Sequence, residues 1–232
     1  MEFLGIINES EMNSIYNGTV IPNGATVMEG IDNLNIYFQI EITLVIFILL
    51  ISIALMKIKK NNPKIKLKEI FKNEKLINKL QNEKNTFKIM KYVFGNLIKI
   101  PAILVGISIL SIPIHEFIHA IFMFGHKVYI GFNPDYFICF ALYTGSMSKW
   151  QNILALIAPF VLLGIIPFVI LTISYPRKIK NKSKYLACVL CIICIMSTMI
   201  PDLIATYNIM KNVPNGAKII DDTEETYWYI EK

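Results

Sequence analysis

Three ionisable side chains stand close together in an otherwise apolar stretch of the sequence. His115, Glu116 and His119 form the pattern H-E-x-x-H. On a helix, residues four apart lie on one face, so the two imidazoles can converge on a single ion. A glutamate beside that ion can take a proton from bound water. The pattern predicts a zinc site of the metallopeptidase type, with His115 and His119 as ligands and Glu116 as the catalytic base.

The apolar surroundings of the motif strengthen this interpretation. A charged group at the centre of a bilayer costs about 2.5 to 3.5 kcal/mol on insertion scales, so such groups are retained mainly for function. The structural alternative is a polar network between helices, in which the glutamate and the two histidines only satisfy one another.

A catalytic zinc usually has a third protein ligand, and two residues are candidates. Asp202 is the only charged residue of the apolar stretch 185–210, and it follows Pro201, which loosens a helix. Counted from the preceding lysines at about 1.5 Å per residue, His115, His119 and Asp202 lie about 24, 30 and 27 Å deep. His126 does not have the spacing of the elongated zinc motif. We therefore favour Asp202 as the ligand and interpret His126 as a residue of the surface or of a substrate groove.

The composition indicates that membrane helices position these residues. Of 232 residues, 54% are hydrophobic and only 17% are charged, and the mean hydropathy is +0.51. A soluble domain is about 25% charged. These values exclude a disulfide-rich secreted scaffold and a disordered tail. The net charge of +6 is concentrated between apolar stretches, which argues against a nucleic-acid partner.

Four apolar stretches approach the roughly 20 residues that a helix needs to cross a bilayer. They are residues 37–57, about 100–124, about 153–174 and about 185–210. Residues 57–99 contain thirteen Lys and three Glu, and residues 177–184 contain five basic residues, so both blocks are predicted to be cytoplasmic. Residues 1–41 contain six acids and no Lys or Arg. The pattern predicts a multi-pass protein of a bacterial cell membrane with both termini outside.

Two segments between these stretches have patterns of their own. Residues 128–147 are aromatic and β-branched and include Gly131 and Gly145, which predicts a short β-hairpin or a re-entrant element. We expect these two glycines, with His126, to line a candidate substrate groove. The Lys-rich residues 58–99 are either a basic amphipathic helix on the inner leaflet or a solvated linker.

The predicted fold is an all-α integral membrane protein of four transmembrane helices, with the hairpin or re-entrant element between the second and third. Its expected parts are an extracytoplasmic segment (1–36), transmembrane helix 1 (37–57), a Lys-rich cytoplasmic segment (58–99) and a zincin-like membrane domain (100–232).

From about Pro113 to its end, the chain resembles a domain of unknown function in bacterial membrane proteins that is described as a zincin peptidase. The resemblance rests on residues 115–120, the loop 131–145, Ala158-Pro159, residues 197–202 and Val213-Pro214. It implies a zinc-dependent peptidase. The pairing of H-E-x-x-H with an aspartate from a later span is also similar in arrangement to intramembrane metalloproteases of the site-2 type.

We interpret the chain as a zinc-dependent membrane-embedded peptidase that acts on a peptide or a membrane-protein substrate in or near the lipid bilayer. The edge of the predicted hairpin would hold that substrate in an extended form. The alternative is a non-catalytic membrane protein with a structural or sensory zinc site. A fourth protein ligand that closes the site would favour the alternative, and His126 is the residue in question.

Overall fold

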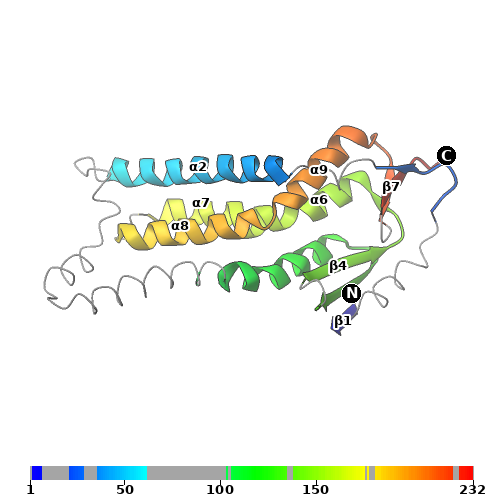
Figure 1. Ribbon diagram of the computed structural model, residues 1–232, viewed down its shortest axis with the longest axis horizontal. Helices are drawn as coiled ribbons and strands as arrows, with labels where there is room; N and C mark the ends of the chain where they lie inside the picture. The colour runs from blue at the N-terminus through cyan, green and yellow to red at the C-terminus, as the bar shows by residue number, and fades with distance from the viewer. Residues whose placement is uncertain are drawn as a thin grey trace, which may run out of the picture.

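The structure is a computed structural model in which long helices run along one axis and short strands gather at one end (Figure 1). It describes residues 2–6, 21–28, 36–61, 103, 106–134, 138–175, 177, 181–221 and 225–231. Most of the predicted Lys-rich cytoplasmic segment, from residue 62 on, and most of the predicted extracytoplasmic segment lie outside these residues, whereas residues 58–61 belong to the helix that ends at Asn61. The domain boundaries and the orientation in the membrane therefore stay predictions.

The helices are α2 (Ile36–Asn61), α6 (Lys149–Pro159), α7 (Ile166–Ser174), α8 (Lys182–Ser197) and α9 (Ile200–Asn212), with a further apolar helix over Gly106–Phe122. A π-helical segment, η1 (Phe160–Ile165), joins α6 to α7, so that Lys149–Ser174 is one continuous helix of 26 residues. The π segment follows Pro159 directly. A proline has no N–H to donate within a helix, so the ladder of α-helical hydrogen bonds is interrupted where the π segment begins.

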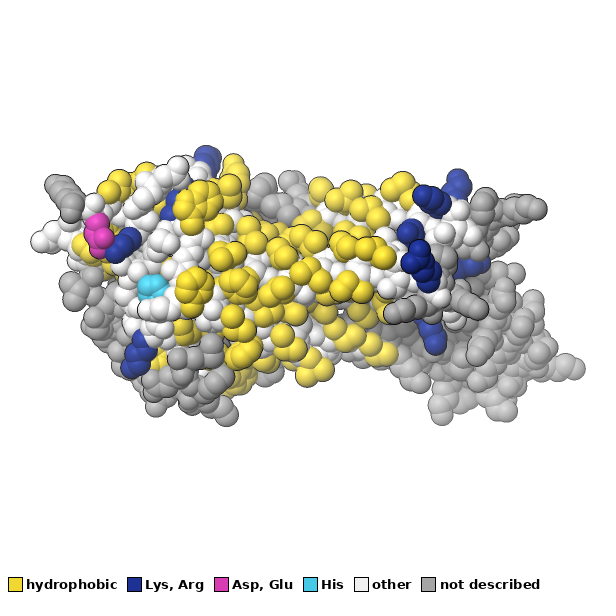
Figure 2. All heavy atoms as spheres, turned by 180° about the vertical axis from the view of Figure 1, so that it is seen from behind, with side chains coloured by type: hydrophobic (Ala, Val, Ile, Leu, Met, Phe, Trp, Pro, Cys, Tyr) yellow, Lys and Arg dark blue, Asp and Glu magenta, His cyan; other side chains and the backbone are white. Residues whose placement is uncertain are grey.

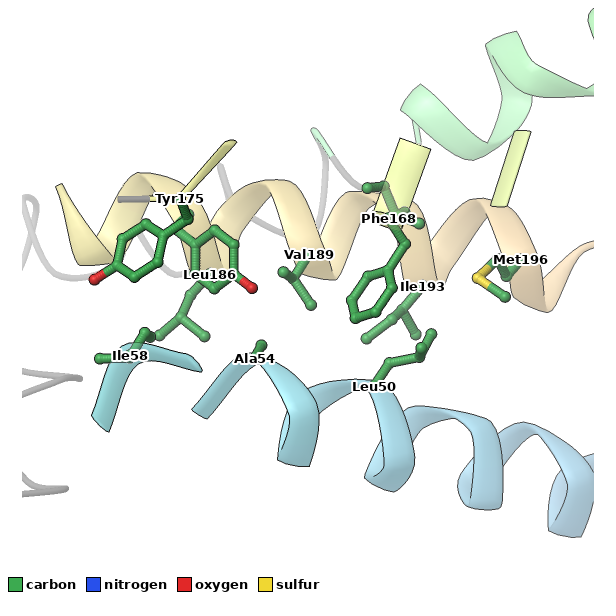
Figure 3. Packing of buried hydrophobic residues seen from close by; sticks show 11 residues of the cluster. Leu50, Ala54, Ile58, Phe168, Tyr175, Leu186, Val189, Ile193 and Met196 are labelled. Carbon is green, nitrogen blue, oxygen red and sulfur yellow. The ribbon is translucent and has the colours of Figure 1, made fainter. Parts of the chain in front are cut away.

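Helix α2 packs along α8 through small and branched apolar side chains (Figure 3). Leu50, Ala54 and Ile58, spaced four residues apart, form one stripe of α2 that faces Leu186 and Val189 of α8. The other faces of α2 are also apolar but exposed. Their large exposed residues are Leu44, Val45, Phe47, Ile48, Leu49 and Met56.

The predicted β-hairpin is confirmed. Strands β3 (Lys127–Asn133) and β4 (Ile138–Thr144) pair antiparallel, from Lys127 opposite Thr144 to Asn133 opposite Ile138. β1 (Glu2–Ile6) pairs parallel to β3, which gives the strand order β1-β3-β4. The hairpin directly follows the helix that carries the H-E-x-x-H motif.

A second sheet was not predicted from the sequence. It contains β2 (Thr26–Val27), β5 (Met147–Ser148), β6 (Lys218–Asp221) and β7 (Thr226–Tyr229), in the order β2-β7-β6-β5. Its strands are two to four residues long, which is too short to show an alternating pattern. The predicted fold class is therefore confirmed only in part: the described residues form a mostly helical protein, as expected, but with two small sheets at one end instead of a single hairpin.

The prediction of four membrane spans is not supported by the helices of the described residues. By length and hydropathy, Lys149–Ser174 can cross a membrane, and Gly106–Phe122 is apolar but shorter. The predicted span 185–210 is broken into α8 and α9, which meet at an angle of 49° and pass the test only as a pair. Pro201 cannot donate to the preceding turn, and the hydroxyls of Ser197 and Thr198 donate to the carbonyls three residues before them, which favours a break here.

Candidate metal centre

Two helices that are distant in the sequence bring together His115, His119 and Asp202. The histidines project from the Gly106–Phe122 helix and the aspartate from the first turn of α9. The two imidazole Nε2 atoms are 2.8 Å apart, and the Asp202 Oδ2 atom lies 3.1 Å from that of His115 and 3.5 Å from that of His119. Both histidines are buried, and the Asp202 side chain is 19% exposed.

These three side chains fit a zinc ion in both chemistry and spacing. Two imidazole nitrogens and one carboxylate oxygen are a donor set found in catalytic zinc sites. Ligand atoms that bind one tetrahedral zinc at 2.0 to 2.1 Å lie about 3.3 Å from one another. The three observed distances lie on either side of that value. Within the described part of the chain, no other His, Cys, Asp or Glu belongs to this group.

A backbone carbonyl of α6 orients His119. The Nδ1 atom of His119 lies 2.8 Å from the carbonyl oxygen of Ala155. Because a carbonyl only accepts, Nδ1 donates to it, and the neutral imidazole keeps its free lone pair on Nε2, the atom that faces Asp202. Pro159 stands four residues after Ala155 and has no N–H, so this carbonyl lacks its ordinary helical partner and remains available to the histidine.

Replacing Pro159 should therefore weaken the metal centre without touching a ligand. In Pro159→Ala, the new N–H competes with His119 for the Ala155 carbonyl. We expect the zinc affinity to fall, but by less than the roughly 10-fold that follows complete loss of the hydrogen-bond partner of a ligating histidine. Titration of zinc against a competing chelator measures this change. Pro167→Ala, in α7, is the control, and equal zinc affinity in both variants would contradict the role given to Pro159.

His115 is held differently. Its ring meets that of His119 edge to face, with the ring centres 4.4 Å apart. Its Nδ1 atom is buried and has no hydrogen-bond partner among the described residues. The orientation of His115 therefore depends on packing and on the groups around its Nε2 atom, whereas His119 has a fixed acceptor behind it.

Glu116 lies between the metal ligands and the hairpin. Its Oε1 atom is 3.8 Å from the Nε2 atom of His115, and its side chain is 17% exposed. The carboxylate also accepts the backbone N–H of Ala141, a residue of β4. The glutamate of the motif is thus fixed beside the three ligands, where a base must stand.

The residues predicted for a substrate groove lie in the hairpin and its ends, and the structure gives each a local explanation. The His126 ring packs against Tyr143, with centres 5.6 Å apart, and His126 is not part of the ligand group. A Cβ atom on Gly131 would come within 2.5 Å of the Phe140 ring opposite. Gly145 has a φ of +91°, which favours glycine. Their role in a groove stays a prediction.

Sequence reasoning missed the groups that support the site from outside the motif. The Ala155 carbonyl and the Ala141 N–H belong to backbone, which carries no residue signature. Pro159 is the one signal in the sequence that points to the free carbonyl. Lys149 was missed as well. Its buried Nζ atom donates to the carbonyls of Val213, at 2.5 Å, and Met210, at 3.4 Å, which ties the start of α6 to the end of α9.

A polar network behind the hairpin joins β4 to the second sheet. The Asn152 amide donates to the Tyr143 hydroxyl at 3.3 Å, and Asp221 accepts hydrogen bonds from Tyr143 and, at 2.8 Å, from Thr226. Burial raises the pKa of the Asp221 carboxyl above its ordinary value, and the two hydrogen bonds offset this only in part.

The raised pKa of Asp221 predicts a stability that depends on pH. A carboxyl whose pKa is higher in the folded than in the unfolded protein favours folding when it is protonated, and this contribution is lost as the pH rises from about 4 through the folded-state pKa. Asp221→Asn stays neutral throughout. We expect its melting temperature to exceed that of the wild type by about 2–4 °C at pH 8 and to lose this advantage near pH 4. Thermal unfolding in detergent across this range measures the effect, and a constant difference would contradict it.

Comparison with known proteins supports the chemistry of the site. Residues 108–218 match the family model described as "Putative zincin peptidase". The matched region contains His115, Glu116, His119 and Asp202, the hairpin, and the helices from α6 to α9. The resemblance predicted from the sequence is therefore confirmed, and it indicates a metallopeptidase. No match was found among curated proteins or among solved structures.

Proposed function

We propose, starting from the match of residues 108–218 to zincin peptidases, that the protein is a membrane-embedded zinc peptidase that hydrolyses a peptide bond in or near the bilayer. One observation carries the proposal. Residues 83 positions apart, His119 and Asp202, meet with His115 in a group of three donors, and Glu116 stands beside them.

The proposed chemistry gives each side chain one task. His115, His119 and Asp202 would hold zinc, which when bound polarises the scissile carbonyl and lowers the pKa of its water toward about 7. The Glu116 carboxylate accepts the proton of the attacking water and returns it to the leaving amine. The hydrogen bond from the Ala141 N–H limits the motion of this carboxylate during the transfer.

Strand β4 is suited to hold an extended substrate. Among the strands that the structure describes, it is an edge of its sheet, with β3 as its neighbour on one side. The Ala141 N–H serves Glu116, so the backbone edge of β4 away from β3 faces the catalytic base. A peptide that adds to this edge would pass beside the metal ligands, and its main chain would supply most of the recognition.

Exposed apolar side chains support the location in a membrane. Figure 2 shows them along the middle of the molecule, with Lys and Arg gathered at one end and charged and His side chains at the other. Among the most exposed are Leu110, Ile173 and Val45, at 72%, 65% and 64%. A soluble monomer rarely exposes so continuous an apolar surface. The continuous helix Lys149–Ser174 is long enough to cross the hydrocarbon core.

The metal content of the purified protein tests the first premise of the proposal, that the protein binds zinc. We expect about one zinc per chain in the wild type and a loss of most of it in His119→Ala, because the best-oriented of the three ligands is removed. His126→Ala is the matched control. Mass spectrometry of metals on both variants, purified in the same detergent, measures the difference. A protein that binds no zinc under any condition would overturn the proposal.

A structural or sensory zinc site is the second candidate. A structural zinc is closed by four protein ligands, whereas a catalytic zinc keeps one position open. In the described part of the chain the group has three donors, and His126 packs on Tyr143 instead of joining it. Three protein donors, instead of four, favour a catalytic zinc site and therefore the peptidase.

A further inference from the structure

We infer that the metal centre lies just inside the membrane–water interface at the sheet end of the molecule. Its substrates would then be extended peptide segments at that interface, such as the stretch where a membrane helix of another protein emerges into water. This inference rests on the proposed function, and it excludes the middle of a transmembrane helix as the site of cleavage.

Two exposed aromatic residues mark the interface at this end. Trp150, in the first turn of α6, is 60% exposed, and Tyr207, in α9, is 56% exposed. A lysine stands near each ring. Lys149 Nζ lies 5.8 Å from the centre of the Trp150 ring, and Lys211 Nζ lies 6.0 Å from that of Tyr207. Exposed Trp and Tyr are typical of the headgroup level of a bilayer. Lys211 is exposed and can reach the headgroups, whereas the Lys149 amine is buried and donates to backbone carbonyls.

The metal centre lies a short way inside these markers, as measured along two separate helices, α9 and α6. Asp202 precedes Tyr207 by five residues on α9. Ala155, whose carbonyl contacts His119, follows Trp150 by five residues on α6. At about 1.5 Å per residue, each separation is about 7.5 Å along its helix. His119 is also close to the end of its own helix, which stops three residues later, at Phe122.

The distance to the opposite end agrees with this placement. Asp202 is eighteen residues from Lys184, which lies near the start of α8 at the basic end of the molecule. At about 1.5 Å per residue the path is at most about 27 Å, and the bend between α8 and α9 shortens it. The hydrocarbon core is about 30 Å thick. Figure 1 shows α9, whose first turn carries Asp202, at the end of the molecule that carries the sheets, whereas Lys184 lies in the first turn of α8, at the opposite end of that helix.

The sheets themselves limit how deep the site can be. Strand β4 reaches Glu116 through the Ala141 N–H, and an open strand edge cannot face lipid because its polar groups would be unsatisfied. At the interface, water can satisfy this edge and also the backbone of an unwound substrate. Both the position of the site and the proposed pairing of a substrate with β4 therefore place the metal centre at the membrane–water interface.

Quenching of tryptophan fluorescence by brominated lipids measures the depth of the site. Trp150 and Trp228 are first replaced by Phe, and one tryptophan is then introduced at Phe117, beside Glu116, or at Leu110, which is seven residues earlier on the same helix. Both positions are exposed, at 42% and 72%. In phosphatidylcholine vesicles we expect bromine near the headgroup to quench Phe117→Trp more strongly, and bromine near the chain end to quench Leu110→Trp more strongly. Deep quenching of both tryptophans, or no quenching of either, would overturn the inference.

Labelling of native cysteines gives an independent measurement. Cys139 in β4 and Cys194 in α8 are both partly buried, which makes them a matched pair. Two variants are made, each with one of these cysteines as its single cysteine and the others replaced by Ala. Both are reconstituted in vesicles that let the labelling reagent reach both sides of the membrane. A charged maleimide should label Cys139 at least several-fold faster than Cys194. Equal rates would contradict the inference. Neither measurement needs zinc or turnover, so a failed depth test is distinct from a failed peptidase test.

Discussion

Glu116→Gln is expected to fold and to retain zinc while peptide hydrolysis falls by about 10²- to 10⁴-fold, the usual contribution of a general base. The amide has the size of the carboxylate and can still accept the Ala141 N–H, but it cannot take a proton from water. Wild-type and variant protein are reconstituted in vesicles and incubated with a library of membrane peptides. Mass spectrometry then compares the new peptide termini that each protein produces. Zinc content is measured on the same samples.

An acidic residue outside the site provides the matched control. Glu231 is exposed and pairs with Lys218 on the surface, an ion pair of the kind that contributes little to stability. Glu231→Gln should cleave as the wild type does. If Glu116→Gln produced the wild-type set of termini at the wild-type rate, the assigned role of Glu116 would be wrong even if the protein contained zinc.

Asp202→Ala is expected to weaken zinc binding by about 10-fold or more, because loss of a direct ligand should cost at least as much as loss of an outer-shell partner. The carboxylate oxygen lies 3.1 and 3.5 Å from the two imidazole nitrogens, so its removal leaves two ligands. Titration with a zinc-specific fluorescent chelator measures the affinity. His126→Ala should keep the wild-type affinity, since its ring packs against Tyr143.

The opposite pair of results would identify a different third ligand. Full zinc affinity in Asp202→Ala together with a loss in His126→Ala would show that His126 completes the site. Asp202→Asn refines the test, because it keeps the shape of the side chain and removes its charge. We expect Asp202→Asn to bind zinc more weakly than the wild type.

The core of the candidate site could be predicted from the sequence because it depends on the spacing of residues along single helices. Residues four apart on a helix must share a face, so the H-E-x-x-H pattern predicts the meeting of His115 and His119, and their Nε2 atoms are 2.8 Å apart. Asp202 could be paired with them because a helix rises by a constant amount per residue, which makes depth a matter of counting. The hairpin was predicted because its strands are seven residues long and rich in β-branched and aromatic residues.

Only the tertiary structure decided what surrounds that core. The second sheet joins strands of two to four residues from distant parts of the chain, and so few residues carry no periodic pattern. The break between α8 and α9 depends on Pro201 together with hydroxyls that compete for carbonyls, whereas hydropathy alone indicates one span there. The acceptor behind His119 and the donor to Glu116 are peptide groups of Ala155 and Ala141. Every residue carries such groups, so their position in the fold, and not their identity, makes them part of the site.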